Sequence, residues 1–386
     1  MAIRNRFAEL HDEITGWRRH IHANPELLYE THETAAFVAD RLREFGVDEV
    51  VTGIGQTGVV GVIRGRANGS GKVVALRADM DALPIEEATG LDYASNNPGK
   101  MHACGHDGHT AMLLGAAKYL AETRNFDGTC IVIFQPAEEG GAGAKAMLDD
   151  GLVDRFGIQE FYGMHNWPGQ DSGKFAIRPG AFFAAADRFK ITVTGKGGHA
   201  AMPQKAVDTV VIASAIVMAL QTVVSRSTNP VDQAVVSVTN IDTGDSAFNV
   251  LPHSAEMIGT VRTLSEEVRD ATEARMAQIV ENTARAYGGE AAFEFIRGYP
   301  VMVNAEEPTD FAASVAETVT GQCDDAPLVM GAEDFAFMLN ARPGAYILMG
   351  NGDTAPVHHP EYNFDDAAIP AGCSWLSEII EQRMPA

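Results

Sequence analysis

The segment Met101–His109 (MHACGHDGH) brings three histidines, one cysteine and one aspartate close together in the sequence. Thiolate and imidazole groups are common ligands of zinc and similar metals. Cys104 and His106 stand two residues apart, and the glycine between them lets the backbone turn so that both can point to one place. A structural zinc knuckle, a reactive thiol and a buried cysteine beside a surface histidine are alternatives, and residues elsewhere in the chain must decide among them.

Two adjacent glutamates, Glu138 and Glu139, follow the apolar run Thr129–Phe134, which predicts a buried strand. Open α/β sheets carry their active sites at the carboxyl ends of strands. Neighbouring carboxylates repel each other unless a cation holds one of them, so the pair suits one metal ligand and one general base. The alternative is a solvated pair that opens the next helix.

More histidines lie where a predicted strand ends or where prolines restrict a loop. His165 ends the predicted strand Glu160–His165, and His358 and His359 lie within Pro356–Pro360. Each of these histidines alone is weak evidence for a metal ligand. Separate clusters that all offer Cys, His or Glu favour one shared site, and about five ligands suit two ions that share a bridging group better than one tetrahedral zinc ion.

The composition is that of a globular enzyme-sized chain. Its 386 residues predict two domains, and hydrophobic and charged fractions of 46% and 21% give ample core material. With 29 basic and 52 acidic residues the net charge is −23, which argues against binding to nucleic acid or to an anionic membrane surface.

We expect a cytoplasmic protein without a membrane span. The four cysteines are far apart and form no dense disulfide framework, the N-terminus does not read as a signal peptide, and polar residues interrupt the longest apolar run, Ala206–Val224.

The hydrophobic pattern of the first part of the chain alternates between helix and strand, which predicts an α/β fold. Helices are predicted over Arg6–Ala23, Glu33–Phe45, His109–Ala121 and Gly143–Asp150, and strands over Gly58–Ile63, Lys72–Arg77, Thr129–Phe134 and Glu160–His165.

The pattern changes near Phe189. The order strand, helix, two strands, helix, strand that follows is the βαββαβ pattern of a ferredoxin-like sandwich. Its elements are Lys190–Thr194, Ala206–Val224, Ala234–Thr239, Glu256–Thr263, Ser265–Tyr287 and Ala292–Arg297; α/β character then resumes with helices Pro308–Thr320 and Ala332–Leu339 and strand Ala345–Met349. We therefore predict a catalytic domain of residues 1–186 and 299–386, interrupted by an inserted domain of residues 187–298.

Several motifs in order along the chain resemble the di-metal aminoacylase and carboxypeptidase superfamily of zinc-type exopeptidases. Within it, they are similar to the amidohydrolase branch that contains hippurate hydrolase and the plant hydrolases of indole-acetyl amino acid conjugates. The motifs lie at Arg19–Leu27, Ala75–Pro84, His102–His109, Gln135–Gly140, Met164–Asn166, Gly197–Pro203, Gly331–Phe335 and Val357–Pro360.

This resemblance implies a zinc-exopeptidase-like catalytic domain with an inserted ferredoxin-like α+β lid and dimerisation domain. It also implies two divalent ions bridged by Cys104. One ion would be completed by His106 and His165, and the other by Glu139 and His358. His359 is the rival of His358, which the family pattern His-x-Pro favours.

The resemblance assigns further roles. Glu138 is implied as the general base, and His199 of the inserted domain as the donor that stabilises the oxyanion, often from the partner subunit. Asn249 and Arg262 would hold the substrate. Asp79 would orient a metal ligand without itself contacting the ion.

The implied activity is a metal-dependent hydrolysis of the amide bond of N-acyl (acetyl, benzoyl or aryl-acetyl) amino acids by a metal-bound water. Zinc, manganese, cobalt and nickel are all compatible with the ligands. A homodimer through the lid is expected, because the predicted helix Ala206–Val224 has more apolar surface than one sheet face requires. A dipeptidase or carboxypeptidase, and a non-catalytic metal or thiol sensor, are the alternative functions.

Overall fold

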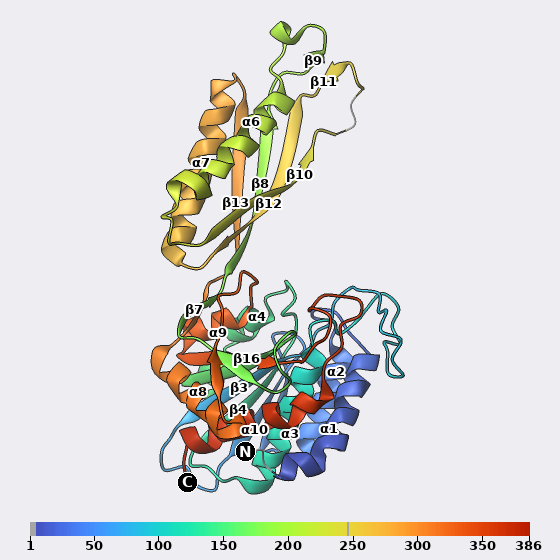
Figure 1. Cartoon of the computed structure of the whole chain (residues 1–386), viewed down its shortest axis with the longest axis vertical. Coiled ribbons are helices and arrows are strands. Elements are labelled where there is room, and N and C mark those ends of the chain that lie inside the picture. The colour runs from blue at the N-terminus through green and yellow to red at the C-terminus, as the bar shows by residue number, and fades with distance from the viewer. Residues whose placement is uncertain (1–4, 245–246) are drawn as a thin grey trace. The chain divides into compact units, whose positions relative to one another are not determined.

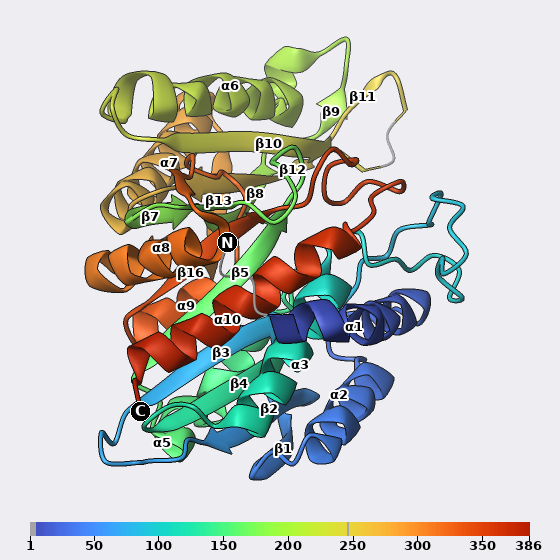
Figure 2. The ribbon, with the colours of Figure 1, turned by 60° about the horizontal axis from the view of Figure 1, so that its bottom comes forward.

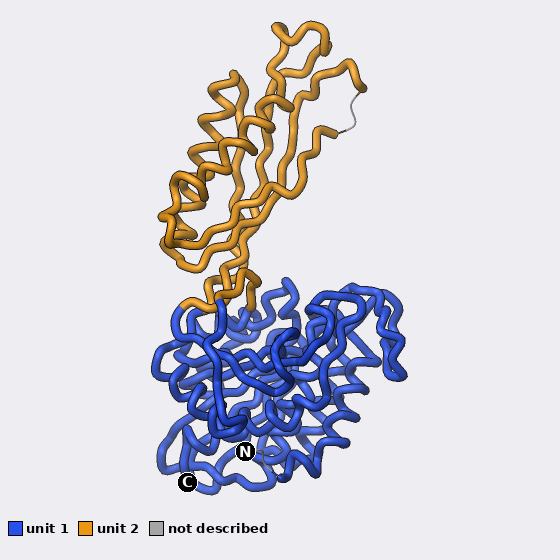
Figure 3. The backbone as a smooth tube through the Cα atoms, viewed as in Figure 1, with its two compact units in different colours: residues 1–180, 303–327, 334–386 blue, residues 181–302, 328–333 orange. Residues whose placement is uncertain are grey.

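The computed structural model describes residues 5–244 and 247–386. The chain divides into two compact units, each described here by itself (Figure 3). Unit 1 comprises Met1–Gly180, Val303–Pro327 and Asp334–Ala386, and unit 2 comprises Ala181–Met302 and Leu328–Glu333.

Unit 1 is built on an eight-stranded sheet with the order β1-β2-β4-β3-β5-β16-β6-β15. The four strands β4, β3, β5 and β16 run parallel to one another at its centre. Their residues are almost all buried, as expected for a sheet that is covered on both faces. The strands are β1 (Glu49–Ile54), β2 (Gly58–Arg64), β3 (Val73–Asp79), β4 (Thr129–Gln135), β5 (Glu160–Trp167), β6 (Phe175–Ile177), β15 (Cys323–Asp325) and β16 (Gly344–Gly350).

Helices cover both faces of this sheet (Figure 2). On one side lie α2 (His32–Glu44), α3 (His106–Thr123), α8 (Glu306–Thr320) and α10 (Ile369–Arg383), with α1 (Asn5–Ala23) packed against α3 and α10. On the other side α4 (Gly143–Asp149) and α9 (Phe335–Ala341) contact β4 and β5, and α5 (Leu152–Phe156) adjoins α4. The result is the mixed α/β fold that the sequence predicts.

Some helices of unit 1 differ from the prediction: α3 begins at His106 rather than His109, and the short α5 was not predicted. The last helix, α10, carries no clear amphipathic pattern because it is buried on nearly all sides, Ser374 and Ser377 included, so it was not predicted. The predicted helix Ala332–Leu339 begins only at Phe335. The Asp334 carboxylate instead accepts hydrogen bonds from Gln135 and from the backbone of Ala144.

Unit 2 contains an antiparallel sheet with the order β10-β12-β8-β13, with α6 and α7 side by side on one face (Figure 1). This order and the βαββαβ sequence of elements are those of a ferredoxin-like sandwich. The elements are β8 (Ala185–Thr194), α6 (Thr209–Thr222), β10 (Ala234–Asp242), β12 (Ser254–Thr263), α7 (Glu266–Ala286) and β13 (Glu290–Tyr299).

A buried ion pair joins the sheet of unit 2 to α7. The Arg269 guanidinium donates to both carboxylate oxygens of Asp187, at 2.9 and 2.5 Å, and the Gly298 amide donates to the same carboxylate at 2.9 Å. Both charged side chains are almost completely buried. Such pairing is required, because an isolated charge inside a protein is strongly destabilising.

The apolar helix of unit 2 departs from the prediction in two ways. It begins at Thr209, since the Asp208 carboxylate caps it by accepting from the amides of Val210 and Val211. By length and composition alone, the stretch Thr209–Ser227 could cross a membrane, contrary to our expectation for this run. This is weak evidence for a span, because Ile212, Ile216 and Leu220 form the core of unit 2.

A buried polar cluster ties α1 to the first turn of α3. The His22 ring donates to Asp107 at 2.8 Å and lies 3.3 Å from Glu87. Arg18 pairs with Asp107 and Asp366. Burial alone would lower the pKa of His22, but its hydrogen bonds to Asp107 and Glu87 outweigh this effect and raise the pKa to about 9. The cluster thus holds α1 against the residue that follows His106.

We predict that His22 stabilises the fold most at neutral and acidic pH. An unfolded histidine titrates near 6.5, so the stabilisation is complete below that pH and is lost as the pH rises through about 9. Urea denaturation should give a difference in unfolding free energy between wild type and His22→Gln that shrinks by about 3 kcal/mol from pH 6 to pH 10. A constant difference would contradict this, and the surface substitution His32→Gln is the control.

Candidate metal centre

Most predicted site residues of unit 1 lie beyond or near the carboxyl ends of neighbouring strands, while Cys104 lies just before α3 and His106 begins it. Because β4, β3 and β5 are parallel, their ends meet at one edge of the sheet. Glu138 and Glu139 follow β4, and Asp79 ends β3. His165 lies near the end of β5, and His358 lies in the loop after β16. The strand order therefore brings together residues that are far apart in the sequence.

Cys104 belongs to two groups of possible metal ligands. Its sulfur lies with the donor atoms of His106 and His165 in one group, and with those of Glu139 and His358 in another. Within each group all donor atoms are within 4.8 Å of one another. One sulfur shared by two groups is the geometry that a bridging thiolate requires.

The histidines of the first group are oriented by backbone carbonyls. His106 Nδ1 donates to the Asp81 carbonyl at 2.8 Å, and His165 Nδ1 donates to the Asn166 carbonyl at 2.6 Å. These bonds direct both Nε2 atoms inward, and His165 Nε2 lies 3.4 Å from the Cys104 sulfur. His106 Nε2 is buried and has no hydrogen-bond partner among the described residues, so it can serve as a ligand atom.

The charges of the site favour a bound cation. Burial would lower the pKa of His106, but the carboxylates of Asp79 and Asp81 outweigh it and raise the pKa to about 10. Burial, together with Glu139 and Glu138, raises the pKa of the Cys104 thiol well above its usual range. Without a bound ion, His106 and Cys104 therefore keep their protons. A divalent ion would displace these protons, and the donor set fits two such ions.

Glu138 lies beside the ligand groups and is almost completely buried. It forms a further donor cluster with His106 and Glu139, and its carboxylate accepts from the Asp334 amide at 3.3 Å. Ala137, just before it, has a φ of 55°, so the chain turns sharply after β4 and presents both glutamates at the sheet edge.

The neighbouring histidines of the segment Met101–His109 differ in what they can do. Both ring nitrogens of His109 are engaged, since Nδ1 donates to Asp79 at 2.7 Å and Nε2 accepts from the Asn166 amide at 2.9 Å. His102 is buried and belongs to no donor group among residues 5–244 and 247–386. Burial lowers the pKa of His102 to about 3, so this ring is neutral.

The two candidates for the last ligand lie in different surroundings. His358 Nε2 is 3.2 Å from a Glu139 carboxylate oxygen, and its amide donates to the Ala103 carbonyl at 2.7 Å. It adopts a φ of 66°, which is strained for a residue with a side chain. His359 instead accepts from the Glu361 amide within its own loop. The geometry thus favours His358 over its neighbour.

Several supporting residues were not found from the sequence. Asn166 donates to the Cys104 carbonyl at 2.6 Å and accepts from the Tyr362 hydroxyl at 2.7 Å. Gly105, with a φ of 84°, packs so closely on both side chains that a Cβ would lie 2.3 Å from the Asn166 amide nitrogen. The His-Asn pair near the end of β5 was a sequence signal for Asn166, whereas no sequence feature pointed to Tyr362.

Asp79 supports the site indirectly. Its carboxylate accepts from His109 and, at 2.6 Å, from Arg77, while His106 Nε2 is 3.7 Å away. The buried Arg77 also donates to Gln135 and Asp334. Asp79 therefore holds His109 and Arg77 in place and lies close to His106, and its role in orienting a metal ligand stays a prediction.

The three predicted site residues of unit 2 do not all lie together. His199 is in β9 (Gly198–His199), which pairs with β11 (Val250–Leu251), and Asn249 precedes β11. Both side chains are exposed. Arg262 lies in β12, where it pairs with Ala186 of β8, eight residues or about 26 Å along the strand from Ser254 at its start. Their predicted roles toward substrate stay predictions.

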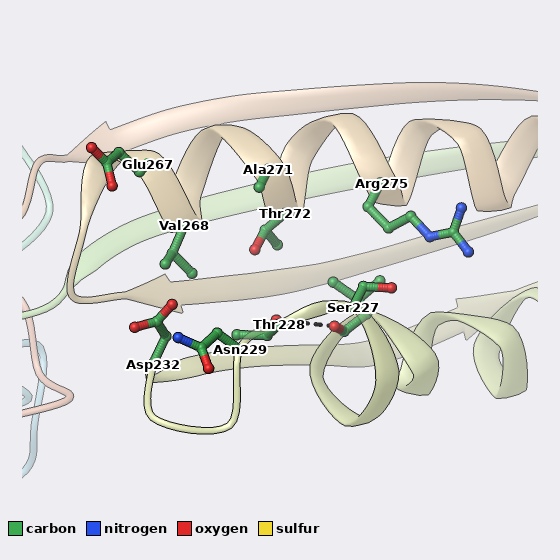
Figure 4. Close-up of a pocket in the computed structure, with 10 residues that line it drawn as sticks. Ser227, Thr228, Asn229, Asp232, Glu267, Val268, Ala271, Thr272 and Arg275 are labelled. Atoms are coloured by element: carbon green, nitrogen blue, oxygen red, sulfur yellow. Dashed lines mark hydrogen bonds between the residues drawn. The ribbon is translucent and has the colours of Figure 1, made fainter.

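A separate hollow of about 280 Å³ lies in unit 2, beside the start of α7. Asp232 and Glu267 lie at one end and Arg275 at the other (Figure 4). Its lining contains neither cysteine nor histidine. This hollow therefore lacks the ligands found at the sheet edge of unit 1.

Similar proteins share both sequence and fold. Hippurate hydrolase of Campylobacter jejuni is 42% identical, over 96% of this chain and 96% of its own. N-acetyl-L-cysteine deacetylase of Bacillus subtilis is also 42% identical, over 96% and 88%. Among solved structures, a dinuclear metal-binding peptidase of the M20 family from Bacillus subtilis is 34% identical with a TM-score of 0.87, covering 98% of this chain and 99% of that one.

The match to a known family covers most of the chain. Residues 75–382 fit the sequence profile of peptidase family M20/M25/M40. This range contains every predicted metal ligand and Glu138. On these grounds the chain belongs to peptidase family M20/M25/M40.

Proposed function

We propose that this protein is a metal-dependent amidohydrolase that cleaves the amide bond of N-acyl amino acids. The observation that carries the proposal is the Cys104 sulfur shared by two ligand groups, with the Glu138 carboxylate beside them. The hippurate hydrolase and the N-acetylcysteine deacetylase among its relatives, named for N-acyl amino acid substrates, support the substrate class.

Two divalent ions, when bound, would activate water and polarise the amide carbonyl. Cys104 would bridge them, His106 and His165 would complete one site, and Glu139 and His358 the other. Thiolate and imidazole favour zinc, cobalt or nickel, while manganese suits the carboxylate and water ligands.

Glu138 is proposed as the general base. Its carboxylate would take a proton from the attacking water and return it to the departing amide nitrogen. The Asp334 amide, which donates to this carboxylate, keeps it in place for both transfers.

Unit 2 is proposed to act as a lid and dimerisation domain. His199 would donate to the oxyanion, from its own or the partner subunit, while Asn249 and Arg262 would hold the substrate. A homodimer through α6 is supported by apolar side chains on the outer side of this helix. Val210, Val211 and Met218 are 44%, 48% and 71% exposed.

We also place the enzyme in the cytoplasm. All four cysteines, Cys104, Cys130, Cys323 and Cys373, are free thiols. Free thiols are typical of a reducing compartment.

Glu138→Gln should remove nearly all turnover and leave metal binding intact. The amide keeps the size of the side chain but cannot accept the proton, so kcat should fall about 10³-fold. Metal analysis should still find two ions per chain. Loss of metal, or unchanged kcat, would contradict the role of base; Glu9→Gln on the surface of α1 is the matched control.

A substrate panel tests the reaction class. Metal-reconstituted enzyme should hydrolyse N-acetyl, N-benzoyl or aryl-acetyl amino acids with a kcat/KM at least tenfold above that for dipeptides, measured by release of the free amine. A preference for dipeptides would support a peptidase on the same centre. No hydrolysis of any member, with both ions bound, would favour a metal or thiol sensor.

The dimer predicts that a charge on the outer side of α6 separates the subunits. Val211→Glu combined with Met218→Glu should convert a dimer into a monomer in sedimentation equilibrium, because two buried carboxylates per subunit would lack partners. The exposed substitution Gln278→Glu on α7 should leave the dimer intact. A monomeric wild type, or a dimeric double variant, would rule out this interface.

A further inference from the structure

Asp81 holds the backbone of both adjacent glutamates. It lies in the loop after β3 and is buried. Its Oδ1 accepts from the Glu138 amide at 2.9 Å, and its Oδ2 accepts from the Glu139 amide at 3.1 Å. One carboxylate thus receives two consecutive backbone N–H groups, one on each oxygen.

The same residue also orients a predicted metal ligand. The Asp81 carbonyl accepts from His106 Nδ1 at 2.8 Å. This bond directs His106 Nε2 toward the donor group that it forms with Cys104 and His165. Asp81 therefore contacts the predicted base, a predicted ligand of one ion and a predicted ligand of the other.

A carboxylate is the side chain best suited to this position. It accepts at both oxygens and donates nothing, so it can satisfy two amides at once. An asparagine of the same shape would direct an NH₂ group at one of them. The turn that Asp81 holds is strained, because Ala137 has a φ of 55°. We therefore expect the chain after β4 to relax when the carboxylate is removed.

We propose that Asp81 is the positioning residue that sets the directions of the two neighbouring carboxylates. By fixing consecutive amides it makes the side chain of Glu138 available for proton transfer and that of Glu139 for metal binding. Asp81 itself touches neither the substrate nor an ion in this account. The proposal rests on the proposed function for the role of Glu138, but not for the metal site.

The test is the substitution Asp81→Asn, read by metal binding as well as by rate. Metal-free protein is titrated with Zn²⁺ in competition with a chromophoric chelator. The affinity for the more weakly bound of the two ions should fall 10- to 100-fold, as is typical when a residue that hydrogen-bonds metal ligands is replaced. With metal in excess, kcat on the best N-acyl substrate should fall at least tenfold while KM changes less than threefold.

Asp48→Asn is the matched control. The Asp48 carboxylate also accepts a backbone amide, that of Arg64 at 2.8 Å, and pairs with Arg124, but it lies at the surface. This variant should bind both ions and turn over substrate as the wild type does. Circular dichroism and thermal melting measure the folded fraction of each variant.

Asp81→Glu decides the outcome if Asp81→Asn fails to fold. It keeps the charge but moves the carboxylate by one methylene group, so the same loss of zinc affinity and kcat is expected. Wild-type zinc affinity and kcat in either folded variant would overturn the proposal, as would a fall in kcat that matches only the loss of folded protein. Because the zinc titration needs no substrate, it tests Asp81 even if the wild type hydrolyses no amide.

Discussion

Buried negative charge is the constraint on which the structure of this site depends. Asp79, Asp81 and Glu138 are almost completely buried at one edge of the sheet, and Glu139 lies beside them. Burying several carboxylates together destabilises the folded protein unless cations lie close to them. The protein itself supplies Arg77, which pairs with Asp79, and a proton on His106, whose pKa is raised to about 10. Two divalent ions would replace that proton and convert an unfavourable cluster into a binding site.

The parallel strands of the sheet bring the charged groups to one edge. Strained backbone conformations then orient the side chains toward one another. The chain adopts positive φ at Ala137, before the two glutamates, and at His358, in the loop that returns to Glu139. Gly105 turns between Cys104 and His106, where Asn166 and Tyr362 leave no room for a side chain. The strained His358 is held by the hydrogen bond from its amide to the Ala103 carbonyl. Rigid supports of this kind keep ligands preorganised, which is what metal binding requires.

Much of this arrangement could be predicted from sequence, and the reasons for the rest are physical. The βαββαβ order of unit 2 follows from clear periodicities, and Cys104, His106 and Glu139 are conspicuous by type and spacing. Helix α10 was missed because burial on all sides removes the periodic signal. The hydrogen bonds of Asp79 to His109 and Arg77 could not be predicted, since hydrogen-bond partners depend on packing rather than on spacing. Asp81 and Tyr362 are ordinary residues in the sequence and gain their roles only through contacts made in three dimensions.

The central claim is that one cysteine joins two metal sites. Crystals of the protein loaded with zinc, measured with anomalous diffraction at the zinc edge, test it most directly. The account predicts two anomalous peaks about 3.5 Å apart, each about 2.3 Å from the Cys104 sulfur, with His106 and His165 on one and Glu139 and His358 on the other. A single peak, or two peaks of which only one contacts Cys104, would contradict it.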